Sequence, residues 1–155
     1  MRLDLIAVGR RAPDWISAGV DEFATRMPRH LPLAVRAVNA GEARRSGDVP
    51  RARGQEADAL LGAAGDARLI ALDERGRSWR TRDLANYLDD AMQEGRDLAF
   101  LIGGADGLHP RCLEAAERQW SLSALTLPHM LVRVIVAEQL YRAWTLLSGH
   151  PYHRG

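Results

Sequence analysis

The stretches LIGGADGLHP (residues 101–110) and SLSALTLPHMLVRVIVAEQLYRAW (residues 121–144) decide the fold of this chain. The first is typical of a buried strand that ends in a glycine turn. The second is typical of a strand, a proline and a long apolar helix. A short polar tail, HPYHRG, closes the sequence. We therefore expect the functional part of the molecule to lie in this C-terminal region.

Apolar runs and helical periodicities alternate through the whole chain. Predicted strands cover residues 2–9, 32–38, 67–72, 97–102 and 121–127, and predicted helices cover residues 13–26, 55–63, 81–94, 110–119 and 129–148. An alternative start for the second helix lies a few residues before residue 55. Five successive strand–helix units imply an α/β fold with a largely parallel five-stranded sheet and helices on both faces. With 155 residues and no linker, the sequence predicts a single domain over residues 1–155.

Two polar segments between these elements are predicted to be surface loops. Residues 39–54 are rich in glycine and arginine, and their four arginines either contact phosphate or are simply solvated. Residues 73–79, DERGRSW, follow the third strand.

The composition is that of a soluble globular protein, with 46% hydrophobic and 26% charged residues and a net charge of +1. All 21 basic residues are arginine, whose planar guanidinium matches phosphate, although a compositional bias would explain the same count. From His129 onward the charged residues are Arg133, Glu138, Arg142 and Arg154. This locally basic end suits an anionic partner or is a solvated face.

Cysteine use and hydropathy indicate a cytoplasmic protein. Cys112 is the only cysteine, so an intrachain disulfide is impossible. The N-terminal apolar run is too short for a signal peptide. The longest uncharged run, residues 119–132, is shorter than the ~18 residues of a spanning helix. We expect no membrane segment.

Three strand ends are the candidate ligand-binding positions, because open parallel sheets bind ligands beyond the carboxyl ends of their strands. They are Leu72-Asp73, Ile102-Gly103-Gly104 and residues 125–128. Glycines at the second end allow a ligand to approach the backbone, although a plain turn would also use them. The sequence contains no dinucleotide fingerprint, P-loop, nucleophile elbow or clustered metal-ligand pattern, so no metal site is predicted.

The last predicted helix, residues 129–148, is apolar over nearly its whole circumference. Such a helix is buried on all sides. A partner subunit would cover its outer face, which predicts a homodimer. The alternative is a central helix within one core.

Polar residues interrupt this helix and form the tail after it. Glu138 and Arg142 lie four positions apart and are expected to pair. Tyr152, His153 and Arg154 offer stacking, titration and a phosphate-binding fork in three consecutive residues. The tail either folds over a site or is frayed.

Together with the opening LDLIAVGRRAPDW, these stretches resemble the RlmH (YbeA-like) branch of the SPOUT methyltransferases over the whole chain. The resemblance implies a C-terminal trefoil knot in a cofactor-binding region at about residues 70–155, a homodimer, and S-adenosylmethionine as the methyl donor. It also implies methylation at N3 of a pseudouridine in large-subunit (23S) ribosomal RNA.

The resemblance further implies that the donor lies in three loops, which coincide with the three strand ends. Carried over by position, the cofactor-binding residues are Leu72, Asp73, Ile102, Gly103, Gly104, Gly107, Leu122, Ser123, Ala124, Leu125, Thr126, Leu127 and Pro128.

Transfer to a pseudouridine N3 requires loss of a weakly acidic proton, for which a histidine is a suitable base. The candidate catalytic residues are His129, Arg133, Arg142, Tyr152, His153 and Arg154. The two histidines are candidate bases, although His129 alternatively holds the turn into the helix. The arginines would bind phosphate or stabilise charge on the uracil oxygens, and the tyrosine would stack on the base.

Two other functions compete with this one. A non-catalytic rRNA- or ribosome-binding dimer would bind RNA but no donor, and a nucleotide-dependent oxidoreductase would need the fingerprint that is missing here. The small net charge gives the protein limited means to hold RNA alone. We therefore expect its rRNA substrate to lie within the assembled ribosome.

Overall fold

The computed structural model describes residues 1–154. The strands are β1 (Leu3–Val8), β2 (Leu33–Val38), β3 (Arg68–Ser78), β4 (Leu98–Ile102) and β5 (Arg118–Ser121). The helices are α1 (Asp14–Ala24), α2 (Val49–Ala64), α3 (Thr81–Glu94), α4 (Pro110–Ala115) and α5 (His129–Ser148), with short 3-10 helices η1 (Glu42–Ser46) and η2 (Pro151–Arg154).

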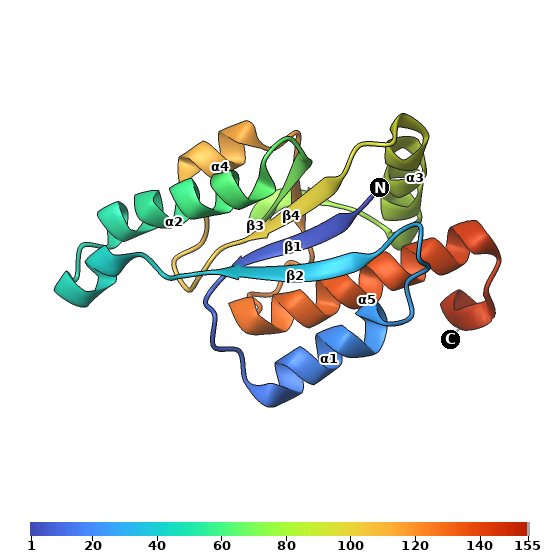
Figure 1. Ribbon diagram of the computed structural model, residues 1–155, viewed down its shortest axis with the longest axis horizontal. Helices are drawn as coiled ribbons and strands as arrows, with labels where there is room; N and C mark the ends of the chain where they lie inside the picture. The colour runs from blue at the N-terminus through green and yellow to red at the C-terminus, as the bar shows by residue number, and fades with distance from the viewer. Residues whose placement is uncertain (155) are drawn as a thin grey trace.

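The five strands form one sheet in the order β2-β1-β4-β3-β5, and all neighbours are parallel, as the sequence predicted. The central strands β1 and β4 are buried along their whole length, which explains why their sequences, LDLIAV and LAFLI, are almost continuously apolar. Figure 1 shows that the strands end together at the side of the sheet where η1 and the start of α5 lie.

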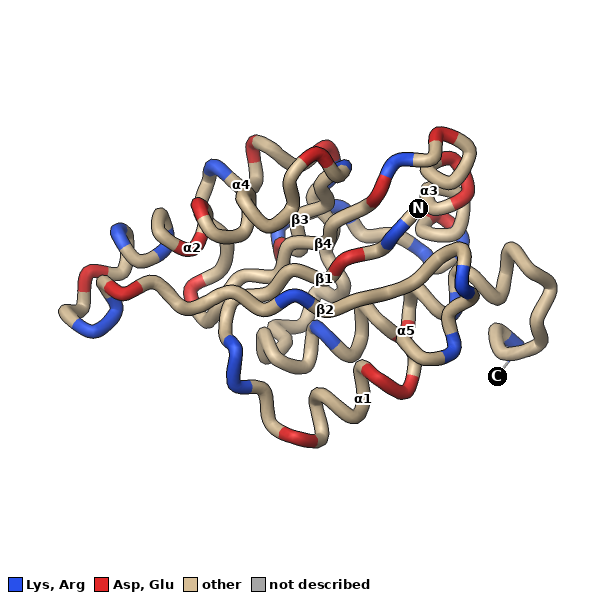
Figure 2. The backbone as a smooth tube through the Cα atoms, in the orientation of Figure 1, with Lys and Arg blue, Asp and Glu red and all other residues tan. Residues whose placement is uncertain are grey.

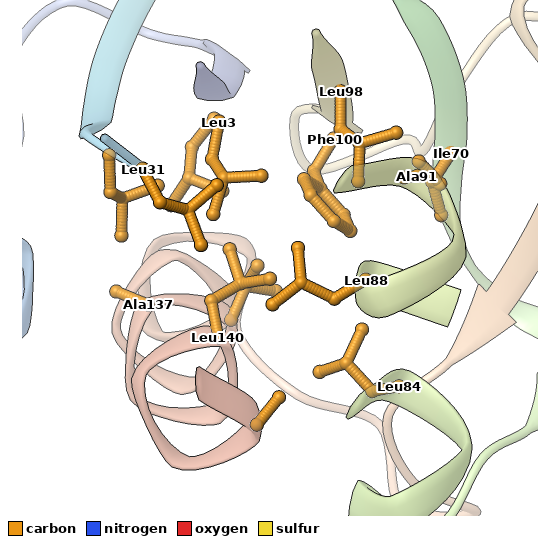
Figure 3. Packing of buried hydrophobic residues seen from close by; sticks show 14 of the residues in the cluster. Leu3, Leu31, Ile70, Leu84, Leu88, Ala91, Leu98, Phe100, Ala137 and Leu140 are labelled. Carbon is orange, nitrogen blue, oxygen red and sulfur yellow. The ribbon is translucent and has the colours of Figure 1, made fainter. Parts of the chain in front are cut away.

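Helices cover both faces of the sheet. α1, α3 and α5 pack on one face, and α2 and α4 on the other (Figure 1). Figure 3 shows Leu88 of α3 and Leu140 of α5 pointing toward Phe100 of β4. These three side chains are fully buried, and each contributes roughly 1.5–3 kcal/mol by leaving water.

Most of residues 39–54 are helical, so the prediction of a surface loop over this whole segment was wrong. The chain forms η1 and then enters α2 at Val49, before the expected residue 55. The Asp48 side chain accepts a hydrogen bond from Arg51 N (3.1 Å), and Pro50 occupies the first turn. Asp48 followed by Pro50 is a typical helix start, but the many glycines and arginines around these two residues favoured the prediction of a loop.

The third and fifth strands also differ from the prediction. β3 continues to Ser78, and its register with β5 shifts between Leu72 and Arg77. β5 covers residues 118–121 rather than 121–127, because Glu117 N already bonds Leu69 O (2.9 Å) and brings the chain into the sheet. This early entry also ends α4 at residue 115 instead of 119. Residues 122–128 are consequently an irregular segment.

Helix α5 spans the bounds that the sequence predicted and ends at Gly149, whose φ is +76°. No side chain from residue 129 to residue 147 is exposed, although many are only half-buried. Its 20 residues span about 30 Å, from the carboxyl ends of the strands to the opposite edge of the sheet (Figure 1). Within residues 1–154 no helix combines the length and hydropathy needed to cross a membrane. The trefoil knot stays a prediction.

Candidate functional site

A cavity of about 760 Å³ lies beyond the carboxyl ends of β3, β4 and β5. This volume is within the range of small-molecule sites. The lining residues come from the three strand ends and the segments that follow them, and from helices α2, α4 and α5: Arg53, Leu72, Asp73, Glu74, Arg75, Ile102, Gly103, Gly104, Ala105, Asp106, Gly107, Leu108, Leu113, Trp120, Ser121, Leu122, Ser123, Leu125, Thr126, Leu127, Pro128, His129 and Val132.

The glycine turn after β4 forms one wall of this cavity. Gly107 N donates to Gly104 O (3.0 Å), and Gly107 has a φ of +77°. A Cβ on Gly103 would lie 2.6 Å from the carbonyl carbon of Gly107. The backbone therefore folds tightly on itself here, and a ligand meets peptide groups without side chains.

The irregular segment 122–128 forms a second wall, held by short-range hydrogen bonds. Ser123 Oγ accepts from Leu125 N (2.9 Å), and Ser121 Oγ donates to Ser123 O (3.1 Å). Such serine turns replace the strand ladder that this segment lacks. Leu125 is 73% exposed, so an apolar side chain stands free at the rim of the cavity.

A cluster of aromatic side chains packs at the strand ends that form the cavity. Trp120 of β5 is buried and lines the cavity. Its ring stacks on Trp79 with centroids 5.4 Å apart and meets Phe100 edge-on at 6.1 Å. These three rings fix the position of β5 against β3 and β4.

An ion-pair network fixes the tip of the glycine turn. Arg44 of η1 binds both carboxylate oxygens of the buried Glu56 (2.6 and 2.8 Å) and also pairs with Asp106. Burial alone would raise the pKa of Glu56, but hydrogen bonds from Arg44 and Gly41 N outweigh it and hold that pKa below its ordinary value. The hydrogen bonds to Glu56 and Asp106 raise the pKa of Arg44. The arginine is thus a fixed cation that ties Asp106 to α2.

Every residue predicted to contact the donor lines this cavity, except Ala124, which is exposed beside it. The three loops thus converge on one place, as expected from the carboxyl ends of a parallel sheet. Their contact with the donor stays a prediction.

The predicted catalytic residues lie in three places. His129, the first residue of α5, is half-buried and lines the cavity. Arg133, one turn later, points elsewhere. Its Nη2 donates to Val8 O (3.0 Å) and Gly9 O (2.7 Å), and burial lowers its pKa. In this structure Arg133 ties α5 to the end of β1 instead of facing the cavity.

Arg142 lies about 20 Å along the axis of α5 from His129, and Tyr152, His153 and Arg154 follow the helix in η2. None of these four residues lines the cavity. Tyr152 Oη donates to Glu138 Oε2 (2.9 Å), and Arg142 Nε lies 3.0 Å from the same oxygen. Burial, followed by this hydrogen bond, raises the pKa of Tyr152. The tail is therefore folded and not frayed, but it does not cover the cavity of its own chain.

Sequence reasoning missed several residues of the site. Arg53 and Arg75 line the cavity, but both stood in segments predicted to be loops. Trp120 stood one residue before the predicted fifth strand. Asp106 carried a usable signal, because an acidic residue inside a glycine turn invites a basic partner, but the partner Arg44 lies 62 positions away.

A parallel α/β sheet with a small-molecule cavity built from three strand ends is consistent with a group-transfer enzyme. The sequence model of the family described as "Predicted SPOUT methyltransferase" matches residues 1–153. The chain belongs to the SPOUT methyltransferase family.

Individual relatives agree with this membership. A protein of Alkalilimnicola ehrlichii called "Ribosomal RNA large subunit methyltransferase H" is 53% identical over 154 residues, which cover 99% of each chain. The crystal structure of a probable methyltransferase from Bordetella pertussis Tohama I is similar with a TM-score of 0.62 at 18% identity, over 92% of this chain and 93% of that one. A tRNA (m1G37) methyltransferase from Aquifex aeolicus has a TM-score of 0.58 at 16% identity, over 92% and 70%. At these identities the two structures support the fold alone.

Proposed function

We propose that this chain transfers a methyl group from S-adenosylmethionine to N3 of a pseudouridine in large-subunit ribosomal RNA. The observation that carries the proposal is the convergence of three separate loops on one cavity in a chain of this family. The rRNA acceptor follows the name of the 53% identical relative. The choice of pseudouridine N3 follows the sequence resemblance.

The residues of the cavity fit the donor. The glycine peptide groups around Gly103 and the backbone of residues 122–128 offer hydrogen bonds to an adenine and to ribose hydroxyls. Apolar side chains such as Leu72 and Ile102 offer contacts to the flat adenine. S-adenosylmethionine supplies an electrophilic methyl group, so the protein must chiefly orient the two reactants and exclude water.

His129 is the candidate base within the same chain, because it is the only histidine that lines the cavity in the described residues 1–154. Its imidazole would accept the N3 proton of the acceptor as the methyl group is transferred. His153 remains the alternative base. It would have to reach the cavity from a second copy of the chain, since η2 lies beyond the C-terminal end of α5 in its own chain.

A homodimer would bring the tail residues close to the cavity, from which they are separated within one chain. The outer side of α5 carries half-buried apolar residues that one chain does not cover, among them Leu131, Ile135 and Leu146. Two copies packed antiparallel along this helix would cover that side. The same arrangement would bring the tail of one copy, with Tyr152 and Arg154, toward the cavity of the other.

The acceptor is expected to lie within the ribosome. Basic and acidic positions alternate along η1, α2 and α4 in Figure 2, without a continuous basic stripe on that part of the chain. With a net charge of +1, long-range attraction to RNA is weak. Recognition of an assembled surface would supply contacts that naked RNA lacks.

The decisive experiment offers radiolabelled S-adenosylmethionine to the protein with isolated rRNA, large subunits or whole ribosomes that lack the modification. Label mapped to a pseudouridine N3 would support the proposal, and the substrate that accepts label would identify what is recognised. Donor binding without label in any rRNA would refute the acceptor. RNA binding without donor binding would favour a non-catalytic rRNA-binding dimer.

Mixed dimers test the shared site. His129→Ala and Arg154→Ala subunits are each expected to form weakly active homodimers, whereas mixing them should restore activity, since one cavity then has both residues. If mixing restores nothing although sedimentation detects the mixed dimer, the tail does not act in the partner's site.

A further inference from the structure

Arg53 is a cation in the wall of the cavity that the proposed reaction does not yet use. It stands in the second turn of α2, and its side chain lines the cavity. Its Nη2 donates to Leu108 O (2.5 Å), the backbone oxygen that follows the glycine turn. The guanidinium is therefore held against one of the three loops that form the site.

The charge of Arg53 has no counter-ion in the part of the chain that the structure describes. Among residues 1–154 no carboxylate lies within ion-pairing distance of it. Of the acidic residues that line the cavity, Asp106 pairs with Arg44 and Asp73 faces Arg75 at 3.9 Å. Glu74 also lines the cavity but forms no ion pair with Arg53. By contrast, Arg111 on the neighbouring α4 pairs with a carboxylate of α2 at 2.7 Å.

The hydrogen-bonding capacity of Arg53 is also largely unused. A guanidinium carries five N–H donors, and the protein accepts from one nitrogen of this group. Its Nε is buried without a partner. Buried donors without partners are rare, and they call for an explanation such as an absent ligand.

We propose that Arg53 binds an anionic oxygen of a substrate in this cavity. This assignment rests on the proposed function. Two substrates carry such an oxygen, namely the carboxylate of the donor's amino-acid tail and a phosphate of the rRNA. Guanidinium forks bind both groups bidentately. The bond to Leu108 O places Arg53 beside a donor-binding loop, which makes the carboxylate the first source to test.

The test compares Arg53→Gln with Arg51→Gln, a matched control two residues away on the same helix, whose side chain is exposed and does not line the cavity. Arg53→Lys keeps the charge and loses the planar fork. Calorimetry measures the binding of S-adenosylmethionine and of decarboxylated S-adenosylmethionine, which lacks only the carboxylate. Urea unfolding establishes that each variant is folded.

If Arg53 binds the donor's carboxylate, Arg53→Gln weakens S-adenosylmethionine binding about tenfold or more and leaves the decarboxylated compound unaffected. If it binds phosphate, both donors keep their affinity. The KM for the rRNA substrate then rises, and the slope of its logarithm against log salt concentration falls by about one.

If the Arg53→Gln and Arg51→Gln variants gave the same donor affinities, the same KM and the same salt dependence, the assignment would be overturned and the proposed function would stand. A folded wild-type protein that bound neither donor would instead overturn the proposed function and this inference with it.

Discussion

The turn at Gly103 provides a sharp test of how the cavity is built. In Gly103→Ala the new Cβ would lie 2.6 Å from Gly107 C and 2.8 Å from Gly107 O and Leu108 N. Cβ atoms do not approach other atoms so closely. Because all three neighbours belong to the backbone, no side chain can move aside, and the turn itself must open.

The expected effect follows from that geometry. Overpacking costs about 1–3 kcal/mol, and weakening the hydrogen bond between Gly107 N and Gly104 O costs about 1 kcal/mol more. We expect Gly103→Ala to lose roughly 2–4 kcal/mol of unfolding free energy. Since the turn is a wall of the cavity, donor binding should weaken by about tenfold or more, which corresponds to about 1.4 kcal/mol.

Urea unfolding followed by tryptophan fluorescence measures the first effect, and calorimetry with S-adenosylmethionine measures the second. Two controls separate crowding from other causes. Gly62→Ala meets open space inside α2 and should stabilise the protein by about 1 kcal/mol without changing donor affinity. Gly107→Ala also meets open space, but its φ of +77° is unfavourable for alanine by about 1–2 kcal/mol. Wild-type stability and wild-type donor affinity in Gly103→Ala would refute the reasoning.

Three further predictions concern charged and polar groups. Asp106→Ala should weaken donor binding with little loss of stability, because it releases the glycine turn from Arg44. Arg44→Met should lose about 3 kcal/mol of unfolding free energy, because it leaves Glu56 buried without its partner. Equal unfolding midpoints of the two variants in urea would contradict this expectation. The pKa values of Glu56 and Glu117 lie below the ordinary 4.5 in the folded state, so stability should be fully present above about pH 4.5 and fall as acid protonates these groups. A Glu56→Gln variant should show a shallower decline in urea unfolding between pH 5 and 3, and an unchanged slope would argue against the linkage. Tyr152→Phe removes the hydrogen bond to Glu138 and should cost about 1 kcal/mol of stability. The variant should also lower the rate of methyl transfer and leave donor affinity unchanged. A change in donor affinity, measured by calorimetry, would place the tyrosine in its own chain's cavity.

The sequence predicted the buried and periodic elements well. β1 and β4 are covered on both faces, so their apolar runs were unambiguous, and the predicted limits of α5 agree with the structure. The parallel sheet followed from the alternation of strands and helices. Prediction was wrong where hydrogen bonds over long sequence distances decide the outcome. The bond from Glu117 N to Leu69 O, for example, moves β5 to residues 118–121.

The candidate site was predictable for a related reason. Carboxyl ends of parallel strands lie at one edge of a sheet, so three loops distant in the sequence had to meet. No such rule places a side chain that reaches the site from a helix. Arg44 and Arg53 approach the glycine turn from η1 and α2, and their sequence context indicates only a polar surface. The same limit applies to the tail, whose distance from His129 depends on the straight course of α5.

The length of α5 has a consequence for how this sequence is able to evolve. One end of the helix carries His129 at the cavity, and the other carries the packed tail. An added residue would lengthen the helix by about 1.5 Å and rotate everything after it by about 100°. A residue added between Glu138 and Arg142 would turn Arg142 and Tyr152 away from their common partner Glu138. Natural variation should therefore change the residue count of α5 very little, and insertions should be found in exposed loops instead.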